Sequence, residues 1–593
     1  MRNRLNLQRW SAISGLLSII ISWTGGIATA ANVTAKKADN FIDSMGINIK
    51  LDRTEYDTNW SKVKPRFQEL GLWHYRDNLK NVNNSSTYRN RYQSLYNEGG
   101  AIGLFIWGPW ENQNKPGNQA VGAAKKGPDY VVYISGPNEP DLFWPNDYDN
   151  NPNTNLWAEA RNYQNQMYNA LKADSATDDI IVTTPPVSNY VLADDLGNVN
   201  SDIMAWHWYT GQGQPDKNEV GTGITQTKIG LGNSSAPNSD LFTTESGHNS
   251  WKTANPGNSN TVAVNEVTQM HYNLRILADQ FRRGIGRTYM HQLMDLGTNA
   301  NDFNHSWGIV KANSNKTPKP FFTAWKNLIN LFKERTWNSS SKTWNIPSFS
   351  AGSLNYSITG NTDAVKNLLL QKSDGDFYML VWVAADSWNE SNDTSRVVNR
   401  NIDIVFNNAQ TVTRQTFNNS GGLINSGISS SNGSKTWSFT ASTVLSILKI
   451  EGGGPVTNVW YKIRNQGHGG NRNLRGGESG INWNVTTATN TGWAAQWKLV
   501  NASSNYFYLR NRGNGGNRNL RADNADNNWN VHTNTNTGDW VQWRLIDVGG
   551  GFYNIRNKGH SGNRNLRAGN GAENWNVNTT TASQQWEKWR FVP

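Results

Sequence analysis

The chain contains no cysteine among its 593 residues. That absence excludes a disulfide-stapled scaffold, a thiolate zinc site and a cysteine nucleophile. Charged residues make up only 17%, which is atypical of a coiled coil or a disordered charged protein. No apolar run reaches the roughly 20 residues that a membrane-spanning helix needs. What the chain does have is length enough for about three domains and 28 tryptophans, whose flat faces favour a role with sugar rings.

Residues 1–30 have the pattern of an export signal. Three arginines within residues 1–9 precede a short apolar stretch at 12–23, and residues 28–30 read Ala-Thr-Ala, which fits a cleavage site. Because the stretch is shorter than a spanning helix, export is favoured over an N-terminal anchor. We therefore expect a secreted bacterial protein, extracellular or periplasmic. We expect it to be a monomer, with no nucleic-acid partner and no membrane insertion.

The C-terminal part of the chain repeats itself three times with a period of 46 residues. The words Asn-Arg-Asn-Leu-Arg and Trp-Asn-Val, and a closing Trp, recur without gaps within 457–593. Each unit offers about four short strand-like pieces joined by Gly and Asn turns, so three units predict twelve strands. That is too few units for a propeller, and no helical pattern is present, whereas a closed three-fold β-trefoil fits.

On these motifs, residues 457–593 resemble the ricin-type β-trefoil lectin family, which also occurs as a carbohydrate-binding module attached to glycosidases. Two features depart from the family. Ala495, Val541 and Glu587 stand where the family has the Gln of Gln-x-Trp, and arginine replaces the Asp that often binds sugar hydroxyls. The resemblance therefore implies the fold but does not carry over the sugar-binding residues. The ligand-binding candidates of this segment are Arg475, Arg521, Arg567, Trp483, Trp529 and Trp575.

The same segment concentrates the positive charge. Residues 456–593 hold sixteen Lys and Arg against seven Asp and Glu, a net charge of +9. Repeat-matched arginines could form an array that binds carboxylate or sulfate groups of a polysaccharide. A plain solvated surface explains the charge as well. Nucleic acid is a third reading, which export disfavours.

Between the two ends, strand-like runs alternate with helical patterns over about 300 residues. Eight such strands predict a (β/α)8 barrel in residues 31–340, with the active site at the carboxyl ends of the strands. The crossover at 210–239 has an irregular pattern. The expected strands are 45–50, 72–76, 102–107, 130–135, 180–184, 203–209, 241–245 and 287–294, and the expected helices are 60–70, 88–96, 156–171, 264–281 and 324–332.

Two glutamates end the appropriate strands. The fourth strand finishes at Asn138-Glu139-Pro140 and the seventh at Glu245, and the pair resembles clan A retaining glycoside hydrolases over about 41–335. The resemblance implies that Glu139 is the general acid/base and Glu245 the nucleophile, with carboxyl groups roughly 5–5.5 Å apart. One carboxyl must hold a proton for the leaving oxygen while the other stays ionised to attack. Surface carboxylates in turns are the structural alternative.

Other strand-end residues are expected to contact a sugar. Strand alternation puts His207 and Tyr209 on one face, which we expect to be the lumen, and the neighbouring tryptophans on the other. The resemblance implies that Asn138 bonds the sugar 2-hydroxyl. No metal-ligand spacing or nucleotide motif is present, so we expect no metal and no cofactor. Further candidates, for which core or ion-pair roles are open alternatives, are Arg76, Trp107, Trp110 and Gln292.

Residues 341–451 alternate strands with Asn, Gly and Ser turns, which predicts a β-sandwich, and 452–456 predicts a short flexible linker. Together the three domains predict a secreted retaining glycoside hydrolase that cleaves a polysaccharide by a two-glutamate double displacement. Endo action is favoured, and an anionic polymer is one option. The rival hypothesis is a non-catalytic carbohydrate-binding or adhesion protein. The sequence leaves open the sugar, the linkage and which repeats bind.

Overall fold

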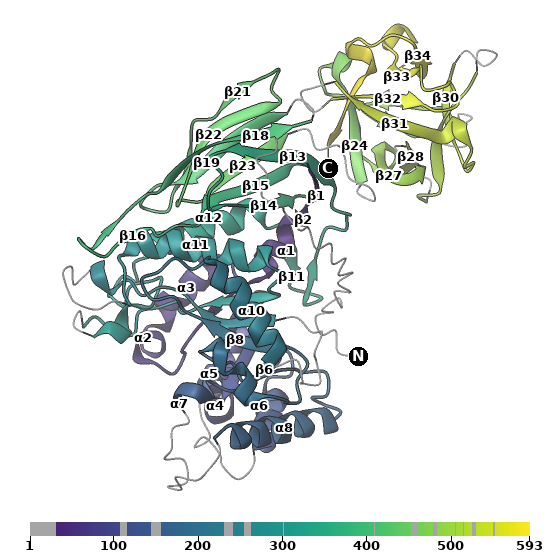
Figure 1. Cartoon of the computed structure of the whole chain (residues 1–593). Coiled ribbons are helices and arrows are strands. Elements are labelled where there is room, and N and C mark those ends of the chain that lie inside the picture. The colour runs from purple at the N-terminus through teal and green to yellow at the C-terminus, as the bar shows by residue number, and fades with distance from the viewer. Residues whose placement is uncertain are drawn as a thin grey trace.

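Figure 1 shows three bodies in a row: a barrel, a β-sandwich packed on one side of it, and a C-terminal module that meets the sandwich. Within the part of the chain that the structure describes, no helix is both long and apolar enough to cross a membrane. The expected export signal, the expected linker, Trp107 and Trp110 lie outside the described residues. This computed structural model describes residues 31–592 without 107–115, 144–155, 231–240, 254–261, 300–301, 408–409, 452–459, 478–482, 504–505, 514, 525–528, 549–551 and 574.

The eight predicted strands form one parallel sheet whose neighbours follow the chain order. Two isolated parallel bridges, Thr183 to Ile203 and Val187 to Trp206, join the first and last strands of the order and close the barrel. The last strand is shorter than expected, because the chain leaves the sheet at His291. The strands are β3 (Met45–Asn48), β4 (His74–Asn78), β5 (Ala101–Ile106), β6 (Val131–Pro137), β7 (Ile181–Thr183), β8 (Met204–Trp208), β9 (Leu241–Ser246) and β10 (Arg287–Met290).

Helices cover the outside of the barrel. The crossover at 210–239, expected to be irregular, contains the helix α10 (Asn218–Gly230). This difference has a physical reason. Its glycines and β-branched residues give it low helix propensity, so packing must decide its conformation. A Cβ at Gly223 would lie 2.9 Å from the Trp206 ring, so the glycine lets this helix approach the barrel. The other helices are α1 (Ala38–Asp43), α2 (Thr54–Asp57), α3 (Trp60–Leu70), α4 (Leu79–Asn84), α5 (Ser86–Tyr96), α6 (Pro116–Lys126), α7 (Pro140–Phe143), α8 (Leu156–Ala173), α9 (Ala193–Leu196), α11 (Glu266–Arg282) and α12 (Pro320–Phe332).

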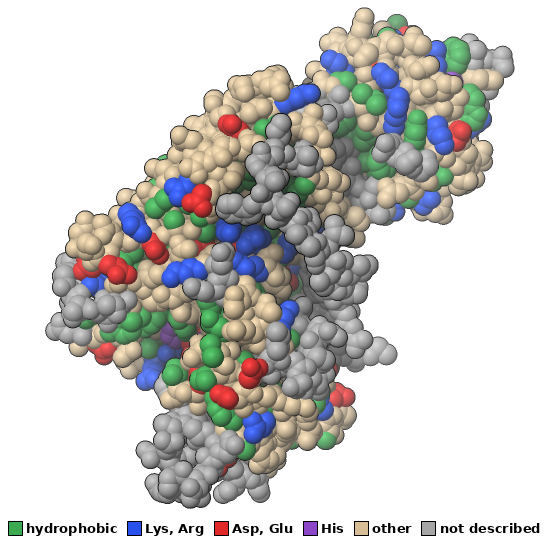
Figure 2. Space-filling model, viewed as in Figure 1, with side chains coloured by type: hydrophobic (Ala, Val, Ile, Leu, Met, Phe, Trp, Pro, Cys, Tyr) green, Lys and Arg blue, Asp and Glu red, His purple; other side chains and the backbone are tan. Residues whose placement is uncertain are grey.

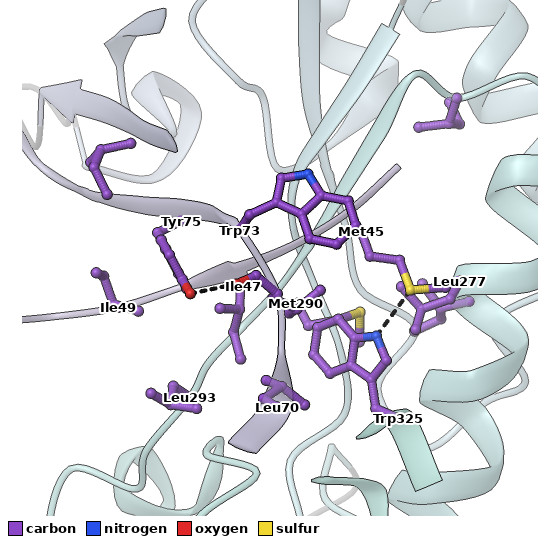
Figure 3. Packing of buried hydrophobic residues seen from close by; sticks show 14 of the residues in the cluster. Met45, Ile47, Ile49, Leu70, Trp73, Tyr75, Leu277, Met290, Leu293 and Trp325 are labelled. Atoms are coloured by element: carbon purple, nitrogen blue, oxygen red, sulfur yellow. Dashed lines mark hydrogen bonds between the residues drawn. The ribbon is translucent and has the colours of Figure 1, made fainter. Parts of the chain in front are cut away.

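The main core lies between the barrel strands and these helices. Figure 3 shows Trp325 of α12 pointing toward Met45 of β3, and the indole N–H donates to the Met45 sulfur at 3.0 Å. Met290 of β10 packs beside them. Flexible thioethers fill the irregular space around an indole well, so the last helix closes against the first and last strands.

The sandwich consists of a five-stranded and a six-stranded sheet. Residues 31–37, expected with the barrel, belong here instead: β1 (Ala31–Thr34) pairs with β13 (Ser353–Gly360), and β2 (Lys36–Lys37) pairs with β14 (Val365–Gln371). The pairing ties the start of the described chain to the sandwich. The other strands of the two sheets are β15 (Phe377–Val383), β18 (Asn399–Phe406), β19 (Thr411–Phe417), β20 (Leu423–Asn425), β21 (Ser429–Ser431), β22 (Thr436–Ser442) and β23 (Ser446–Glu451).

Strand β15 shows why the sandwich and the barrel share one core. Alternate residues of a strand face opposite sides of its sheet. Tyr378, Leu380 and Trp382 join the barrel core, whereas the residues between them pack between the two sheets. All seven residues of the strand are buried. A continuous apolar strand is what a sheet covered on both faces requires.

A buried ion pair strengthens the same contact. Arg275 of α11 donates to Asp216 through Nε at 2.9 Å, and both side chains are fully buried. The Trp382 indole N–H donates to the same carboxylate at 2.6 Å. Removing one member of such a buried pair leaves an uncompensated charge, so the barrel and sandwich depend on each other.

The C-terminal module is a closed, three-fold repeated β-structure. Its first strand, β24 (Trp460–Asn465), pairs with its last, β35 (Lys588–Val592), so the two ends of the module lie side by side. Its own core contains Trp497, Trp543 and Trp589, the closing tryptophans of the three repeats. Its remaining strands are β25 (Asn473–Arg475), β26 (Thr486–Ala488), β27 (Gln496–Ser503), β28 (Tyr506–Asn511), β29 (Arg518–Ala522), β30 (Val531–Asn534), β31 (Gln542–Asp547), β32 (Tyr553–Asn557), β33 (Asn565–Ala568) and β34 (Val577–Thr580).

The module touches the rest of the protein through an aromatic side chain. Phe349, which precedes β13, is 5% exposed and belongs to the module's core cluster. The Tyr461 hydroxyl of β24 donates to the Ser373 carbonyl oxygen of the sandwich at 3.3 Å. The module is thus held by packing as well as by its covalent connection.

Candidate active site

Glu139 stands at the carboxyl end of β6. Its φ is 44°, in the left-handed region that few non-glycine residues adopt. Pro140 follows, and a residue before proline is disfavoured in the right-handed helical region. The Glu139 backbone N–H donates to the Pro186 carbonyl oxygen at 3.1 Å, which fixes the turn. Such strained conformations gather at functional sites, and here the turn presents a carboxyl group that is only 8% exposed.

Glu245 stands at the end of β9 and is 7% exposed. Its Oε1 accepts a hydrogen bond from Arg76 Nη1 at 2.5 Å, and its Oε2 accepts one from the Tyr209 hydroxyl at 3.0 Å. Both carboxylate oxygens are therefore held. Oriented, hydrogen-bonded carboxylates favour the ionised form.

The two glutamates face each other across the barrel mouth. One ligand atom from each of Glu139, His207 and Glu245 lies within 4.8 Å of the others, so a carboxylate oxygen of Glu139 lies within 4.8 Å of one of Glu245. Among the described residues these three are also the group that could hold a metal ion. The separation fits the pair expected of a double-displacement enzyme.

Arg76 of β4 connects the carboxyl ends of β6 and β9 through hydrogen bonds. It is 0% exposed, and it donates to Asn138 Oδ1 at 2.6 Å as well as to Glu245. A third bond goes to Asn48 Oδ1 at 2.9 Å. The guanidinium also lies 4.1 Å from the Phe105 ring centroid. The sequence left substrate contact and an ion-pair role open for Arg76; the guanidinium is fully buried and forms an ion pair with the Glu245 carboxylate.

His207 and Tyr209 face the lumen, as strand alternation predicts. His207 Nδ1 lies 2.7 Å from Glu139 Oε1, and its Nε2 lies 3.9 Å from Glu245 Oε1. Trp206 and Trp208, on the other face, are part of the main core. His207 thus bridges the two carboxyl groups, while Tyr209 serves only Glu245.

Electrostatics distinguishes Glu245. Burial alone would raise its pKa, but nearby positive charge outweighs burial and holds that pKa well below its ordinary value. The charge comes from His207 and His291 in their protonated form, from Arg76 and from Lys50. Burial lowers the pKa of His291 to about 3, so this ring is neutral near neutral pH. Arginine stays protonated at every relevant pH. Arg76 is therefore the permanent counter-charge that keeps Glu245 ionised.

Three residues at the mouth escaped the sequence analysis. His291 Nδ1 lies 3.4 Å from Glu245 Oε2, and Trp307 is half-buried, with its ring centroid 5.3 Å from that of Tyr209. Asn48 holds Arg76. Strand alternation could have identified His291, because residues 289 and 291 fall on the same face of a strand. Tyr289 lies over Gly46 inside the barrel, which shows that this face is the inner one. Nothing in the sequence separates Trp307 from the other tryptophans.

Two predicted contacts stand differently. Gln292 is fully buried, and its side-chain amide makes no hydrogen bond with any described residue. Asn138 is 1% exposed, and its Nδ2 donates to Glu139 Oε2 at 3.4 Å. The structure therefore gathers Asn138, Glu139, His207, Tyr209, Glu245 and Arg76 into one cluster, and it gives Gln292 no contact with them.

The module's candidate tryptophans are engaged within the protein. Each is half-buried with φ near 60°, and an arginine of another repeat lies over its ring. Repeat one receives its arginine from repeat two, repeat two from repeat three, and repeat three from repeat one. The pairs are Trp483 with Arg518, Trp529 with Arg564 and Trp575 with Arg472, all 3.7 Å from guanidinium carbon to ring centroid.

The three candidate arginines of the module do not form an unpaired array. Arg521 pairs with Asp523 at 2.7 Å, and Arg567 pairs with Glu573 at 3.1 Å. These carboxylates occupy positions that an anionic ligand would have to share. Arg475 is half-buried on β25.

Comparison with solved structures finds remote likenesses. A family 39 glycoside hydrolase from Bacteroides cellulosilyticus WH2 is 13% identical, with 71% of this chain and 83% of that chain covered and a TM-score of 0.42. A monomeric β-xylosidase from Caulobacter crescentus CB15 is 11% identical, with 70% and 97% covered and a TM-score of 0.44.

A designed three-fold symmetric protein, ThreeFoil, is 29% identical over 23% of this chain and 98% of its own, with a TM-score of 0.20. No protein-family model matches the chain, and no curated protein sequence matches it. Because these likenesses are remote and partial, any function must be argued from the geometry of the site.

Proposed function

We propose that the protein is a retaining glycoside hydrolase in which Glu245 is the nucleophile and Glu139 the general acid/base. The observation that carries this proposal is the approach of their carboxylate oxygens to within 4.8 Å. Inverting enzymes keep the two groups about 6.5–9.5 Å apart to admit a water between carboxylate and sugar. A closer pair leaves room for direct attack on the anomeric carbon.

In the first step, Glu245 attacks C1 of the sugar and the C1–O bond to the leaving group breaks. Glu139 gives its proton to the departing oxygen, and a glycosyl ester with Glu245 remains. Arg76 and Tyr209 hold Glu245 ready for this attack, because their hydrogen bonds and charge stabilise the carboxylate. The low pKa of Glu245 keeps it ionised across the whole neutral range.

In the second step, Glu139 is a carboxylate and accepts a proton from water, whose oxygen attacks C1. The ester bond breaks, Glu245 is released as a carboxylate and Glu139 is protonated again. Two inversions give net retention. His207, in contact with Glu139 at 2.7 Å, orients that carboxyl group in both steps.

The C-terminal module completes the proposal as a β-trefoil that binds polysaccharide. Its three 46-residue repeats and closed strand pairing support the fold. A polymer-binding module is more useful to an enzyme that cuts a polymer than to one that acts on a disaccharide, which favours endo action. The export-like residues 1–30 favour action outside the cell.

The deciding experiment follows the anomeric configuration of the first product by proton NMR on whichever glycoside a substrate panel identifies. We expect the configuration of the cleaved bond to be kept. An inverted first product would overturn the double-displacement mechanism.

The rival, a non-catalytic sugar-binding or adhesion protein, shares the barrel. Release of reducing ends from a panel of neutral and anionic polysaccharides separates the two. An adhesion protein releases none, whereas an enzyme does so only while Glu245 is intact.

A further inference from the structure

The module exposes one tryptophan far more than the others that the structure describes. Trp493 is 66% exposed, the highest value among the exposed large apolar side chains of the described chain. It lies in the short turn that precedes the closing strand β27 of repeat one. A single exposed apolar side chain is common on protein surfaces, so the residues around Trp493 decide whether it has a role.

One cation lies beside this indole, and a second lies over the ring of Trp460. The Arg512 guanidinium carbon lies 5.3 Å from the Trp493 ring centroid and 5.6 Å from that of Trp460. Lys498 Nζ lies 4.9 Å above the Trp460 ring. Arg512 Nη1 also donates to Gln496 Oε1 at 2.6 Å, which fixes its direction. We call Trp460, Trp493, Lys498 and Arg512 the Trp493 face.

No acid neutralises the Trp493 face within the described part of the chain, since neither cation forms an ion pair there. The module as a whole carries a net positive charge. In Figure 2 the visible surface of the module carries several Lys and Arg side chains and few Asp and Glu. Exposed aromatic surface with unpaired cations beside it is suited to a ligand with both a flat apolar face and negative charge.

The other two repeats provide an internal comparison. At the equivalent site between repeats two and three, Lys558 replaces Arg512, and it likewise reaches Gln542 and lies over the Tyr506 ring at 5.4 Å. There, however, Asp539 replaces Trp493 and pairs with Lys558 at 2.9 Å. The scaffold of the site is thus present, but it is neutralised and has no indole.

The third equivalent site, between repeats three and one, differs more from the Trp493 face. Gln466 and Gln585 stand at the positions of the arginine and the exposed tryptophan. Since two repeats fold with Asp or Gln at the turn, the fold does not require Trp493. Position 493 is therefore free to serve a role other than folding.

We propose that the Trp493 face binds a sugar unit carrying a carboxylate or sulfate, with the ring stacked on Trp493 and the anion bonded to Arg512 and Lys498. This rests on the proposed polysaccharide-binding role of the module and assigns it to residues other than the repeat-matched arginines. Binding is then confined to a single site, which repeats one and two form together. The substrate class follows: an anionic polysaccharide.

The test measures binding by isothermal titration to the full chain carrying Glu245→Gln, so that polymer is not cut. The probes are polygalacturonate for carboxylate, dextran sulfate for sulfate, and neutral dextran. We expect Trp493→Ala to weaken binding about tenfold, because it removes the flat apolar face on which the sugar ring stacks. Arg512→Gln should weaken it several-fold, with a smaller loss in high salt.

Matched controls come from the other repeats. Lys558→Gln removes the same charge from the site between repeats two and three, and Gln585→Ala changes the equivalent turn of repeat three. Neither change should alter binding. Equal losses from Arg512→Gln and Lys558→Gln would overturn the site in favour of diffuse surface charge. So would absence of binding to both anionic polymers. Trp493→Ala alters an exposed residue, which seldom affects folding.

These readouts do not involve hydrolysis. A chain that lacks glycosidase activity but shows the expected pattern supports the Trp493 face while refuting the proposed reaction. An active glycosidase with no difference between the variants refutes the Trp493 face alone.

Discussion

The barrel site and the C-terminal module use charge in opposite ways. In the barrel, side chains from strands 62 and 169 residues away converge on one buried cation, Arg76, which orders Asn138 and Glu245. In the module, arginines recur at equivalent positions every 46 residues, and they stack on a tryptophan, as Arg518 does on Trp483, or pair with an acid. Convergence produces a single perturbed group, whereas repetition produces a stable frame. Function in the module is therefore to be sought where a repeat departs from the pattern.

The largest expected effect lies at the convergent site. Glu245→Gln removes the nucleophile, and we expect the initial rate on any glycoside substrate to fall at least about 1,000-fold, equivalent to about 4 kcal/mol. Arg521→Gln, in the repeated part, is the matched control and should leave the rate unchanged. A comparable loss in both variants would mean that the two regions are not separable.

A smaller effect is expected when the module is removed. A chain ending at residue 451 should keep its rate on soluble oligosaccharides but lose about tenfold or more on dilute polymer, because the attached module raises effective concentration. Phe349→Ser in the shortened chain removes the aromatic ring that truncation exposes. Equal loss on both kinds of substrate would show that the module belongs to the active enzyme.

Changing the buried cation should shift the pH profile. Arg76→Gln removes one of the positive charges that offset burial, so the pKa of Glu245 rises and the acid limb of kcat/KM moves to higher pH. Because the pKa of Glu245 is lower in the folded chain than in the unfolded chain, its ionised carboxylate stabilises the fold at pH values above the unfolded-state pKa. This stabilisation is lost as the pH falls through the folded-state pKa.

Arg335→Gln is a suitable control for this shift. Arg335 is also buried and pairs with Asp39, but at the opposite end of the barrel. Its loss should lower the free energy of unfolding without moving the acid limb. An unshifted profile in Arg76→Gln would remove Arg76 from the role of counter-charge.

The smallest effect separates two arginines of the module. Arg518 stacks on Trp483 of another repeat, so Arg518→Gln should lower the free energy of unfolding by about 1–2 kcal/mol. Arg521 makes a partly exposed pair with Asp523, and Arg521→Gln should cost under about 1 kcal/mol. Urea denaturation of the full chain measures both, and the reverse order would contradict the cyclic stacking.

Much of the fold follows from sequence because its signals are local. The eight barrel strands are short runs of three to seven residues, most of them apolar, and the repeats reveal their own period. Helix α10 was not predicted because Gly223 allows a tertiary contact with Trp206, and no window of local sequence contains that contact. Strands β1 and β2 were missed because two-residue and four-residue edge strands carry almost no pattern.

The site was less accessible than the fold. Glu139 and Glu245 could be found from their positions at strand ends, and His207 and Tyr209 from alternation. The role of Arg76 could not, because a guanidinium that contacts sugar and one that supports a carboxylate look alike in sequence. Likewise, the stacking of Arg518 on Trp483 joins residues of different repeats, and repetition reveals only that both matter, not that they meet.

The cyclic exchange of arginines also determines how the module can be rearranged. Each repeat lends an arginine to another, and the first and last strands, β24 and β35, are hydrogen-bonded neighbours. A chain opened between two repeats and joined across its former ends would keep every stack, so the module should tolerate circular permutation at repeat boundaries. A fourth unit, by contrast, could be added by gene duplication only if the closed ring opened, because each tryptophan already has an arginine over its ring.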